Sequence, residues 1–358
     1  MIKERVAVAL SGGVDSATAA LLLKKADYDV FGVHMCLWQD GALQKNSPYN
    51  LHKSEQTIDR MKTNCQALDI PFYIIHLEQE FRKYVVDYFS KEYMQGLTPN
   101  PCVACNQHIK FGFLLDEANL LGAKYLATGH YARIKYFNGN YHLFKGIDSS
   151  KDQSYVLYTI GNDKLGRIIF PLGNYTKAQV YAIAQENGLF SANHYSSSQD
   201  LCFIQGDYRE YFRHNNITMI PGEIVNSGGN VLGQHKGIAF YTIGQRCGMG
   251  IAAENRLYVK EIDIKNNRII AGMEDELYSD ELIAYQVKWI SGTPPCNPID
   301  VTVKIRYRSP NIEAVLYPEV SSAKVHLKQP QRAITPGQAV VFYNDGEVFG
   351  GGIIKNEK

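Results

Sequence analysis

The sequence contains no apolar run long enough for a membrane-spanning helix, and it has almost no net charge. Its 37 Lys and Arg residues are balanced by 36 Asp and Glu residues, which gives a formal net charge of +1. This balance neither announces nor excludes a nucleic-acid partner, which would need a local basic face. The first residues enter a strand-like stretch without the apolar core of a signal peptide. We therefore expect a cytoplasmic protein that does not bind a membrane.

Internal repeats and low-complexity segments are also missing. The 358 residues are 45% hydrophobic and 20% charged, which is enough for two or three globular domains. Strand-length apolar runs alternate with helical patterns in the first half, as in a parallel sheet covered by helices. Past about residue 205, short strands between glycine-rich turns replace the helices. The second half is therefore predicted to be all-β and to end in a β-barrel.

The individual elements follow from apolar periodicity. In the first half we expect strands over residues 6–10, 28–35, 72–77 and 124–129, and helices over 17–25, 54–68, 81–94 and 176–187. Asn138 and Gly139 predict a type I′ turn in a hairpin over 132–145, and residues 36–53 are expected to form a long loop. Later strands are expected over 223–225, 237–242, 257–263, 268–272, 301–307, 313–317, 323–327, 339–343 and 348–354.

The residues from Ser11 to Ser16, SGGVDS, lie between an apolar strand and an Ala- and Leu-rich helix. Glycine permits the tight turn, and a helix N-terminus directs backbone N–H groups toward one spot. The run predicts a phosphate site, whereas two glycines alone would suit simple packing, and it lacks the Gly-Lys-Ser/Thr of a Walker loop. Asp15 is expected either beside Mg²⁺ or as a helix cap. Because strand ends converge in parallel sheets, Met35 and Gly129 are expected near adenine.

The segment over residues 98–106, TPNPCVACN, contains a Cys-x-x-Cys pair. A helix is predicted from about Asn106, which places Cys105 near its N-terminus with His108 and Lys110 nearby. Both features favour the thiolate, which is the nucleophilic form of cysteine. The pair could be half of a zinc site, although a second Cys-x-x-Cys and finger-spaced histidines are missing, or a thioredoxin-like redox pair, although the preceding prolines do not suit that motif. From spacing alone, catalysis, a metal site and plain packing receive about equal weight.

The chain has seven cysteines, which in a cytosolic protein are expected to be mostly thiols. Cys202 lies between Leu201 and Phe203, a setting that is typical of a small core residue. Its serine- and aspartate-containing flank weakens that interpretation only slightly. The remaining cysteines, Cys36, Cys65, Cys247 and Cys296, are interpreted as structural or incidental.

Seven segments in one order are together similar to the bacterial tRNA-specific 2-thiouridylase (MnmA) family, over essentially the whole chain. They are SGGVDS, PNPCVACN, KDQSY from Lys151, DLCF from Asp200, YTIGQR from Tyr241, RYR from Arg306 and PGQAVVF from Pro336. SGGVDS also resembles the loop of the ATP pyrophosphatase (PP-loop) superfamily, which cleaves ATP between its α and β phosphates.

The resemblance implies an α/β N-terminal domain with a parallel sheet of the adenine nucleotide alpha hydrolase type, followed by two small β domains. The implied boundaries are 1–208 for the ATP-binding catalytic domain, 209–276 for a central β domain and 277–358 for a tRNA-contacting β-barrel. Such enzymes adenylate the C2 oxygen of the wobble uridine in tRNA and replace it with sulfur, releasing AMP and pyrophosphate. A sulfurtransferase that uses ATP and Mg²⁺ and receives sulfur from a persulfide donor protein is therefore expected, with no resident metal site.

The resemblance also implies roles for individual residues. Cys105 would be the nucleophile, Cys202 would carry the persulfide, and the two would form a transient disulfide. ATP binding is implied for Ala9, Leu10, Ser11, Gly12, Gly13, Val14, Asp15, Ser16, Met35 and Gly129. Contacts with tRNA are implied for Asn100, Pro101, Cys102, Lys151, Asp152, Gln153, Arg306 and Tyr307.

Two residues depart from the family pattern. Cys102 stands where many members have Asp, which leaves open whether Cys102 or Cys105 reacts. Cys247 stands where Lys is common, which removes a positive charge from a loop expected to face tRNA. Lys304, Arg306 and Arg308 are expected to alternate along one strand, either as a phosphate track or as a solvated face.

Two other functions remain open at this point. One is a different ATP pyrophosphatase, such as an amidating ligase or a lysine-adding tRNA synthetase, whose chemistry needs no pair of reactive thiols. The other is an ATP-sensing or zinc-stapled RNA-binding module without enzymatic activity.

Overall fold

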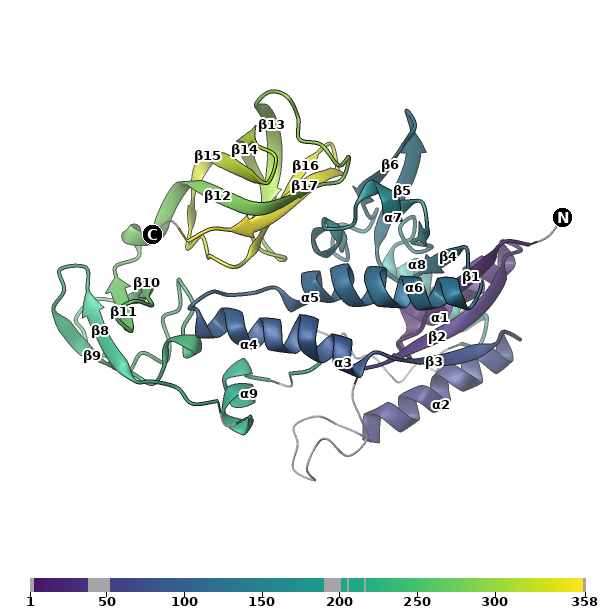
Figure 1. Cartoon of the computed structure of the whole chain (residues 1–358), viewed down its shortest axis with the longest axis horizontal. Coiled ribbons are helices and arrows are strands. Elements are labelled where there is room, and N and C mark those ends of the chain that lie inside the picture. The colour runs from purple at the N-terminus through teal and green to yellow at the C-terminus, as the bar shows by residue number, and fades with distance from the viewer. Residues whose placement is uncertain (1–2, 38–51, 190–200, 205, 216, 357–358) are drawn as a thin grey trace.

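The computed structural model describes residues 3–37, 52–189, 201–204, 206–215 and 217–356 (Figure 1). Its N-terminal part is a parallel sheet with the strand order β3-β2-β1-β4-β7. The strands are β1 Arg5–Ala9, β2 Asp29–Cys36, β3 Phe72–His76, β4 Tyr125–Ala127 and β7 Ile168–Ile169. The central strand β1 buries Val6, Ala7 and Val8 completely, as expected for a strand covered on both faces. The predicted α/β domain is confirmed.

The helices of the N-terminal part lie between or after these strands in the chain, and several of them cover the sheet (Figure 1). They are α1 Val14–Lys25, α2 His52–Ala67, α3 Glu78–Phe81, η1 Arg82–Val86, α4 Asp87–Met94, α5 Pro101–Ala104, η2 Cys105–Phe113, α6 Leu114–Leu120, η3 Ser154–Leu157, α7 Asn162–Leu165, α8 Lys177–Glu186 and α9 Tyr208–His214. The loop expected over 36–53 lies largely outside the described residues.

The helix that was predicted from about Asn106 begins earlier, at Pro101. Asn100 caps it, since its side-chain oxygen accepts hydrogen bonds from the N–H groups of Cys102 and Val103. Pro101 suits the first helical position because its missing N–H and fixed φ cost nothing there. The position of Cys105 therefore differs from the prediction: it lies one turn inside the helical segment.

The hairpin and the helix over 176–187 are confirmed. Strands β5 Ala132–Phe137 and β6 Asn140–Lys145 are joined by Asn138 at φ 50° and Gly139 at φ 79°, as a type I′ turn requires. Thr176 forms a capping box with Gln179 at the start of α8, which satisfies two backbone groups reciprocally.

A small mixed sheet follows, with the order β10-β11-β8-β9. Its strands are β8 Gly222–Asn226, β9 Val231–His235, β10 Tyr258–Asp263 and β11 Arg268–Gly272. The strand expected over 237–242 is wrong, because this segment forms the short helix η4 Ile238–Phe240 instead. Gly237 starts that turn at φ 130°, and the Phe240 N–H bonds back to its carbonyl.

The C-terminal part is a closed six-stranded antiparallel barrel. Its strands are β12 Tyr278–Trp289, β13 Ile299–Lys304, β14 Ile312–Pro318, β15 Ser322–Arg332, β16 Ala339–Asn344 and β17 Glu347–Ile354, and the short helix η5 Asp275–Leu277 precedes them. Pairing of β12 with β17 closes the barrel, which confirms the predicted architecture. Because β13 ends at Lys304 and the chain then turns, the expected single-strand row of Lys304, Arg306 and Arg308 is wrong.

The barrel packs on the α/β domain beside the segment that precedes Cys102 (Figure 1). The Thr98 N–H donates to the Pro336 carbonyl at 2.9 Å, and the Gln338 amide donates to the Thr98 carbonyl at 2.9 Å. Gly337 lies against Thr98 so closely that a Cβ there would sit 2.7 Å from its backbone nitrogen. The Tyr155 hydroxyl, buried in the same interface, donates to the Ala339 carbonyl. The barrel thus holds the thiol-bearing segment in place.

Among the described residues, no helix combines the length and the apolar character that crossing a membrane requires.

Candidate active site

The loop from Ser11 to Ser16 has the geometry of an anion site. Gly12 adopts φ 75°, and Gly13, at φ −89° and ψ 160°, precedes the first turn of α1. The Ser16 hydroxyl donates to the Gly13 carbonyl at 3.1 Å and accepts from the Ser11 N–H at 3.2 Å. These bonds set the turn so that the N–H groups at the start of α1 are available to a phosphate.

Asp15 is neither a helix cap nor an open carboxylate. Its two oxygens accept from the Lys177 ammonium at 2.6 and 2.7 Å, and the Tyr131 hydroxyl donates to one of them at 2.7 Å. Gln153 in turn clamps Tyr131: its side chain accepts from the Tyr131 N–H, and its own N–H donates to the Tyr131 carbonyl. The expectation that Asp15 caps the helix is therefore wrong, whereas the expectation that it lies beside Mg²⁺ stays a prediction.

Lys177 is a site residue that the sequence interpretation missed. It occupies the first position of α8, where a positive charge opposes the helix dipole. The ion pair with Asp15 compensates for this unfavourable position. A lysine at the start of a predicted helix was therefore the sequence feature that could have indicated a buried or paired charge.

The predicted ATP residues gather at one edge of the sheet. The register Ala9↔Val33 and Val8↔Ala127 places Met35 and Gly129 at the same C-terminal edge as the Ser11–Ser16 loop. A Cβ on Gly129 would lie 3.1 Å from the Asp15 Cβ and from the Ser16 nitrogen, so glycine permits the close approach. Leu10 and Val14 are buried beneath the loop, and Ala9 ends β1.

Three thiols from two distant segments all lie close enough to the Lys110 ammonium to be affected by its charge. Cys102 and Cys202 are exposed and Cys105 is half-buried, and all three are free thiols. Burial raises the pKa of the Cys202 thiol, ionisation of Cys105 or Cys102 would raise it further, and the Lys110 ammonium lowers the pKa of each of the three. We call Cys102, Cys105, Cys202 and Lys110 the thiol cluster.

Phe203 explains how Cys202 reaches the thiol cluster. Its ring is buried and makes edge-on contacts with Phe81, Phe89 and Tyr211 at centroid distances of 6.0, 5.3 and 6.0 Å. The Ile204 N–H bonds to the Leu201 carbonyl, which closes a turn around the cysteine. The core residue of this segment is thus Phe203, and the interpretation of Cys202 as a core residue is wrong.

The thiols are protonated at neutral pH in this structure. The surrounding protein displaces water and raises the pKa of Cys102 and Cys105, with the Lys110 charge opposing the shift, and the same burial raises the pKa of Cys202 to about 12. Cys202 is accessible to solvent and yet surrounded by protein, so contact with water does not restore full hydration. The expected thiolate-favouring position of Cys105 at a helix N-terminus is wrong.

Lys110 lies between the thiol cluster and the C-terminal edge of the sheet, where the predicted ATP residues gather. Its ammonium lies 3.3 Å from His130 Nε2, and His130 Nδ1 lies 2.7 Å from the Thr128 hydroxyl. Burial and the neighbouring ammonium lower the pKa of His130 well below its usual range. The neutral ring therefore accepts from Lys110 at Nε2 and donates to Thr128 from Nδ1. The wide π-helical turns of η2, kinked at Phe111, carry Lys110 toward this partner.

The residues predicted to contact tRNA lie together, but several have internal partners. Asp152 accepts from the Gly146 and Ser154 N–H groups and from the Ser154 hydroxyl. Arg306 donates to the Ala333 carbonyl at 2.6 Å and to the Thr335 hydroxyl at 2.7 Å. Asn100 caps α5, Pro101 is buried and Gln153 holds Tyr131, as described above.

Tyr307 joins this group to the thiol cluster. Its hydroxyl lies 3.4 Å from the Asp152 carbonyl, and the charge of Cys102 is one cause of its raised pKa, after burial and Asp152. Tyr307 and Lys151 are exposed. These two side chains, rather than Asp152 and Arg306, remain accessible to a bound molecule.

Comparison with known proteins covers nearly the whole chain. Three family models match: "tRNA methyl transferase HUP domain" over residues 4–206, "tRNA methyl transferase PRC-barrel domain" over 210–273 and "Aminomethyltransferase beta-barrel domain" over 279–354. A protein of Roseiflexus sp. named tRNA-specific 2-thiouridylase MnmA is 43% identical, over 99% of this chain and 100% of its own length. The protein of that name from Acetivibrio thermocellus is 42% identical, over 99% of this chain and 100% of its own length. The Thermoanaerobacter sp. protein named tRNA-specific 2-thiouridylase MnmA 2 is 45% identical, over 99% of this chain and 99% of its own length.

Proposed function

The chain belongs to the tRNA-specific 2-thiouridylase (MnmA) family, and from this membership and the site geometry we propose the reaction that follows. The enzyme is a tRNA sulfurtransferase of the PP-loop type. We propose that it adenylates the C2 oxygen of the wobble uridine with ATP and replaces that oxygen with sulfur. Residues 1–208 are proposed as the catalytic domain, 209–276 as a central β domain and 277–358 as a tRNA-contacting barrel.

The observation that carries this proposal is the thiol cluster. Cys202 and Cys105 come from separate segments, yet Cys105 packs in the same hydrophobic cluster as Leu201 and Phe203, the neighbours of Cys202. Burial raises the pKa of both thiols, and the Lys110 ammonium opposes that shift in each. A different ATP pyrophosphatase would need no such pair. The Lys110–His130–Thr128 chain runs from this pair toward the loop proposed to hold the pyrophosphate end of ATP.

In the proposed first step, the uridine C2 oxygen attacks the α phosphorus of ATP and pyrophosphate leaves. The N–H groups after Gly13 would bind the departing pyrophosphate, because preorganised donors stabilise developing negative charge. Mg²⁺ is proposed to accompany ATP and to offset its charge. Asp15 is paired with Lys177 and Tyr131, so an ion that used its carboxylate would have to share it with these partners or displace them.

In the second step, a donor protein loads Cys202 with a persulfide. Either the terminal sulfur attacks C2 directly, or Cys105 attacks the Cys202 sulfur and releases sulfide, which attacks C2. In both routes AMP leaves, the bond between the two persulfide sulfurs breaks and a Cys105–Cys202 disulfide forms. An external thiol reductant then supplies two electrons to reopen that disulfide.

The protonation state of the thiols adds a requirement. Because burial raises the pKa of both thiols, binding of the substrates is proposed to lower it before Cys202 takes sulfur from the donor and before Cys105 attacks the resulting persulfide. Lys110 is the cation placed to assist, since it already opposes the effect of burial on both thiols. The base would have to be unstacked from the anticodon loop to reach them.

The test is incubation of the protein with ATP, Mg²⁺, a persulfide donor and unmodified tRNA, followed by mass analysis of the nucleosides for 2-thiouridine. Cys105→Ser and Cys202→Ser should abolish the product while ATP binding persists, and Cys296→Ser is the matched control with an exposed cysteine. Full activity in Cys105→Ser would indicate that Cys102, and not Cys105, is the nucleophile. Activity that survives loss of both thiols would favour another pyrophosphatase reaction.

A further inference from the structure

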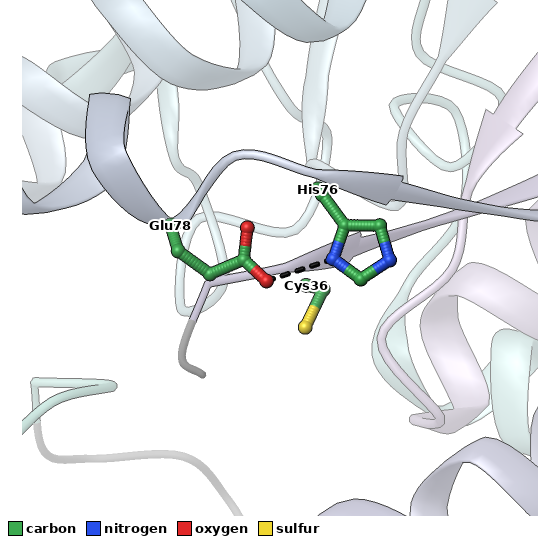
Figure 2. A group of neighbouring side chains, drawn as sticks. All are labelled: Cys36, His76 and Glu78. Carbon is green, nitrogen blue, oxygen red and sulfur yellow. Dashed lines mark hydrogen bonds and ion pairs between the residues drawn. The ribbon is translucent and has the colours of Figure 1, made fainter. Parts of the chain in front are cut away.

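A second cluster lies where β2 and β3 end, and the proposed reaction does not use it. Cys36 is the last residue of β2 and pairs in register with His76, the last residue of β3. Glu78 begins α3 two residues later. Figure 2 shows the His76 ring and the Glu78 carboxylate facing each other, with the Cys36 side chain beside them. A sulfur, a ring nitrogen and a carboxylate oxygen therefore meet at this edge.

The three groups are already in contact. The His76 Nδ1 and Glu78 Oε1 atoms are 2.8 Å apart, and the Cys36 thiol also hydrogen-bonds the Glu78 carboxylate. The three ligand atoms all lie within 4.8 Å of one another. In the part of the chain that the structure describes, this is the one group of three or more His, Cys, Asp or Glu residues with such spacing.

We propose that Cys36, His76 and Glu78 bind a divalent cation of the zinc class. Zinc bonds of about 2.0–2.3 Å in tetrahedral geometry separate ligand atoms by roughly 3.3–3.6 Å. The observed group needs shifts on the order of 1 Å to reach that spacing. Cys36 and Glu78 are half-buried and His76 is exposed, so a cation can enter without unfolding of the sheet.

The chemistry of the group selects the metal. A thiolate and an imidazole favour zinc and similar borderline-soft cations, whereas magnesium and calcium prefer oxygen ligands. One thiolate and one carboxylate carry two negative charges, which match a divalent cation beside a neutral histidine. The bound cation would fasten the end of β2, next to Met35, to the end of β3, where the Leu77 N–H already bonds to the Cys36 carbonyl.

The experiment uses the full chain with Cys102→Ser, Cys105→Ser and Cys202→Ser, which removes competing thiols of the proposed active site. Zinc is titrated alone, and cobalt is used as a spectroscopic probe, since a bound thiolate gives a charge-transfer band. We expect one zinc per chain. Loss of an outer-shell partner weakens metal affinity about 10–100-fold, so Cys36→Ser should weaken it by at least about 100-fold.

His76→Gln should also weaken zinc binding and alter the cobalt spectrum, whereas Cys296→Ser and Cys247→Ser should change neither. Because the His76 side chain is 71% exposed, this variant keeps the fold, which circular dichroism would verify. Unchanged zinc affinity in Cys36→Ser would overturn the proposal, and so would the absence of zinc binding in the parent chain. Neither result bears on the thiolation reaction, because that is assayed with Cys102, Cys105 and Cys202 intact.

Discussion

Alkylation of Cys202 should be slow at pH 8 and should accelerate far into the alkaline range. Its thiol has a pKa of about 12 instead of the ordinary 9.0. The thiolate fraction at pH 8 therefore falls from about one in ten to about one in ten thousand, a factor of roughly 1,000. A more basic thiolate is also the better nucleophile, and with a Brønsted coefficient of about 0.4–0.5 this raises the alkylation rate by roughly 16–32-fold, which offsets part of the loss. The expected net retardation is about 30–60-fold.

The assay is iodoacetamide alkylation of the full chain without tRNA, followed by mass spectrometry that resolves each cysteine. A short peptide with the sequence around Cys202 provides the unperturbed reference. Between pH 8 and 11, the Cys202 rate should rise about tenfold per pH unit without a plateau, whereas the peptide should level off. At pH values where Cys105 ionises, Cys105→Ser should increase the rate at Cys202, because burial raises the pKa of Cys202 and the negative charge of an ionised Cys105 raises it further.

A plateau near pH 9, or a rate equal to that of the peptide at pH 8, would refute the conclusion that Cys202 is held protonated. A Cys105→Ser variant with an unchanged profile would instead refute the electrostatic contact between the two thiols. Adding tRNA and ATP tests the next step, because the proposed reaction requires these substrates to lower the pKa of the thiols.

Three further predictions concern packing around the site. Gly12→Ala would place a side chain at positive φ and against the Thr57 methyl group, so it should lower the free energy of unfolding by about 1–3 kcal/mol and weaken ATP binding in calorimetry. Thr57→Ser removes that methyl group and should partly restore both quantities. No restoration would contradict the packing explanation. Gly337→Ala should reduce 2-thiouridine formation while ATP affinity is unchanged, because its Cβ would push against Thr98 and not against the phosphate loop; equal losses would count against this. Phe203→Ala should cost about 3–5 kcal/mol in urea denaturation and Phe203→Leu clearly less, whereas equal stability of all three chains would show that the ring is no anchor.

The parts of the fold that the sequence predicted are those that depend on local patterns. Asn138-Gly139 specifies a turn by its own backbone preference, and the apolar run Val6–Leu10 followed by SGGVDS specifies a strand and an anion loop within a few residues. The start of α5 was also encoded locally, since Asn100 before Pro101 is a cap followed by a first-turn proline. The sequence analysis missed it because it placed the start of the helix at about Asn106.

The remaining site features depend on tertiary contacts, which one sequence does not display. The raised pKa of Cys105 comes from protein packed around it, although its neighbours in the chain include His108 and Lys110. The ion pair of Lys177 with Asp15 joins residues 162 positions apart. The pairing of Cys36 with His76 depends on the register of β2 and β3, which apolar periodicity alone leaves undefined.

The hydrogen bonds between Thr98 and the Pro336–Gln338 turn have a consequence for biosynthesis. A ribosome makes Thr98 and the neighbouring cysteines long before it makes the turn that supports them. A nascent chain released before residue 336 would carry a complete phosphate loop but an unsupported thiol-bearing segment. Support of the thiol-bearing segment is therefore coupled to synthesis of the Pro336–Gln338 turn, and a chain that stops before this turn would keep the Ser11–Ser16 loop but lose both hydrogen bonds to Thr98.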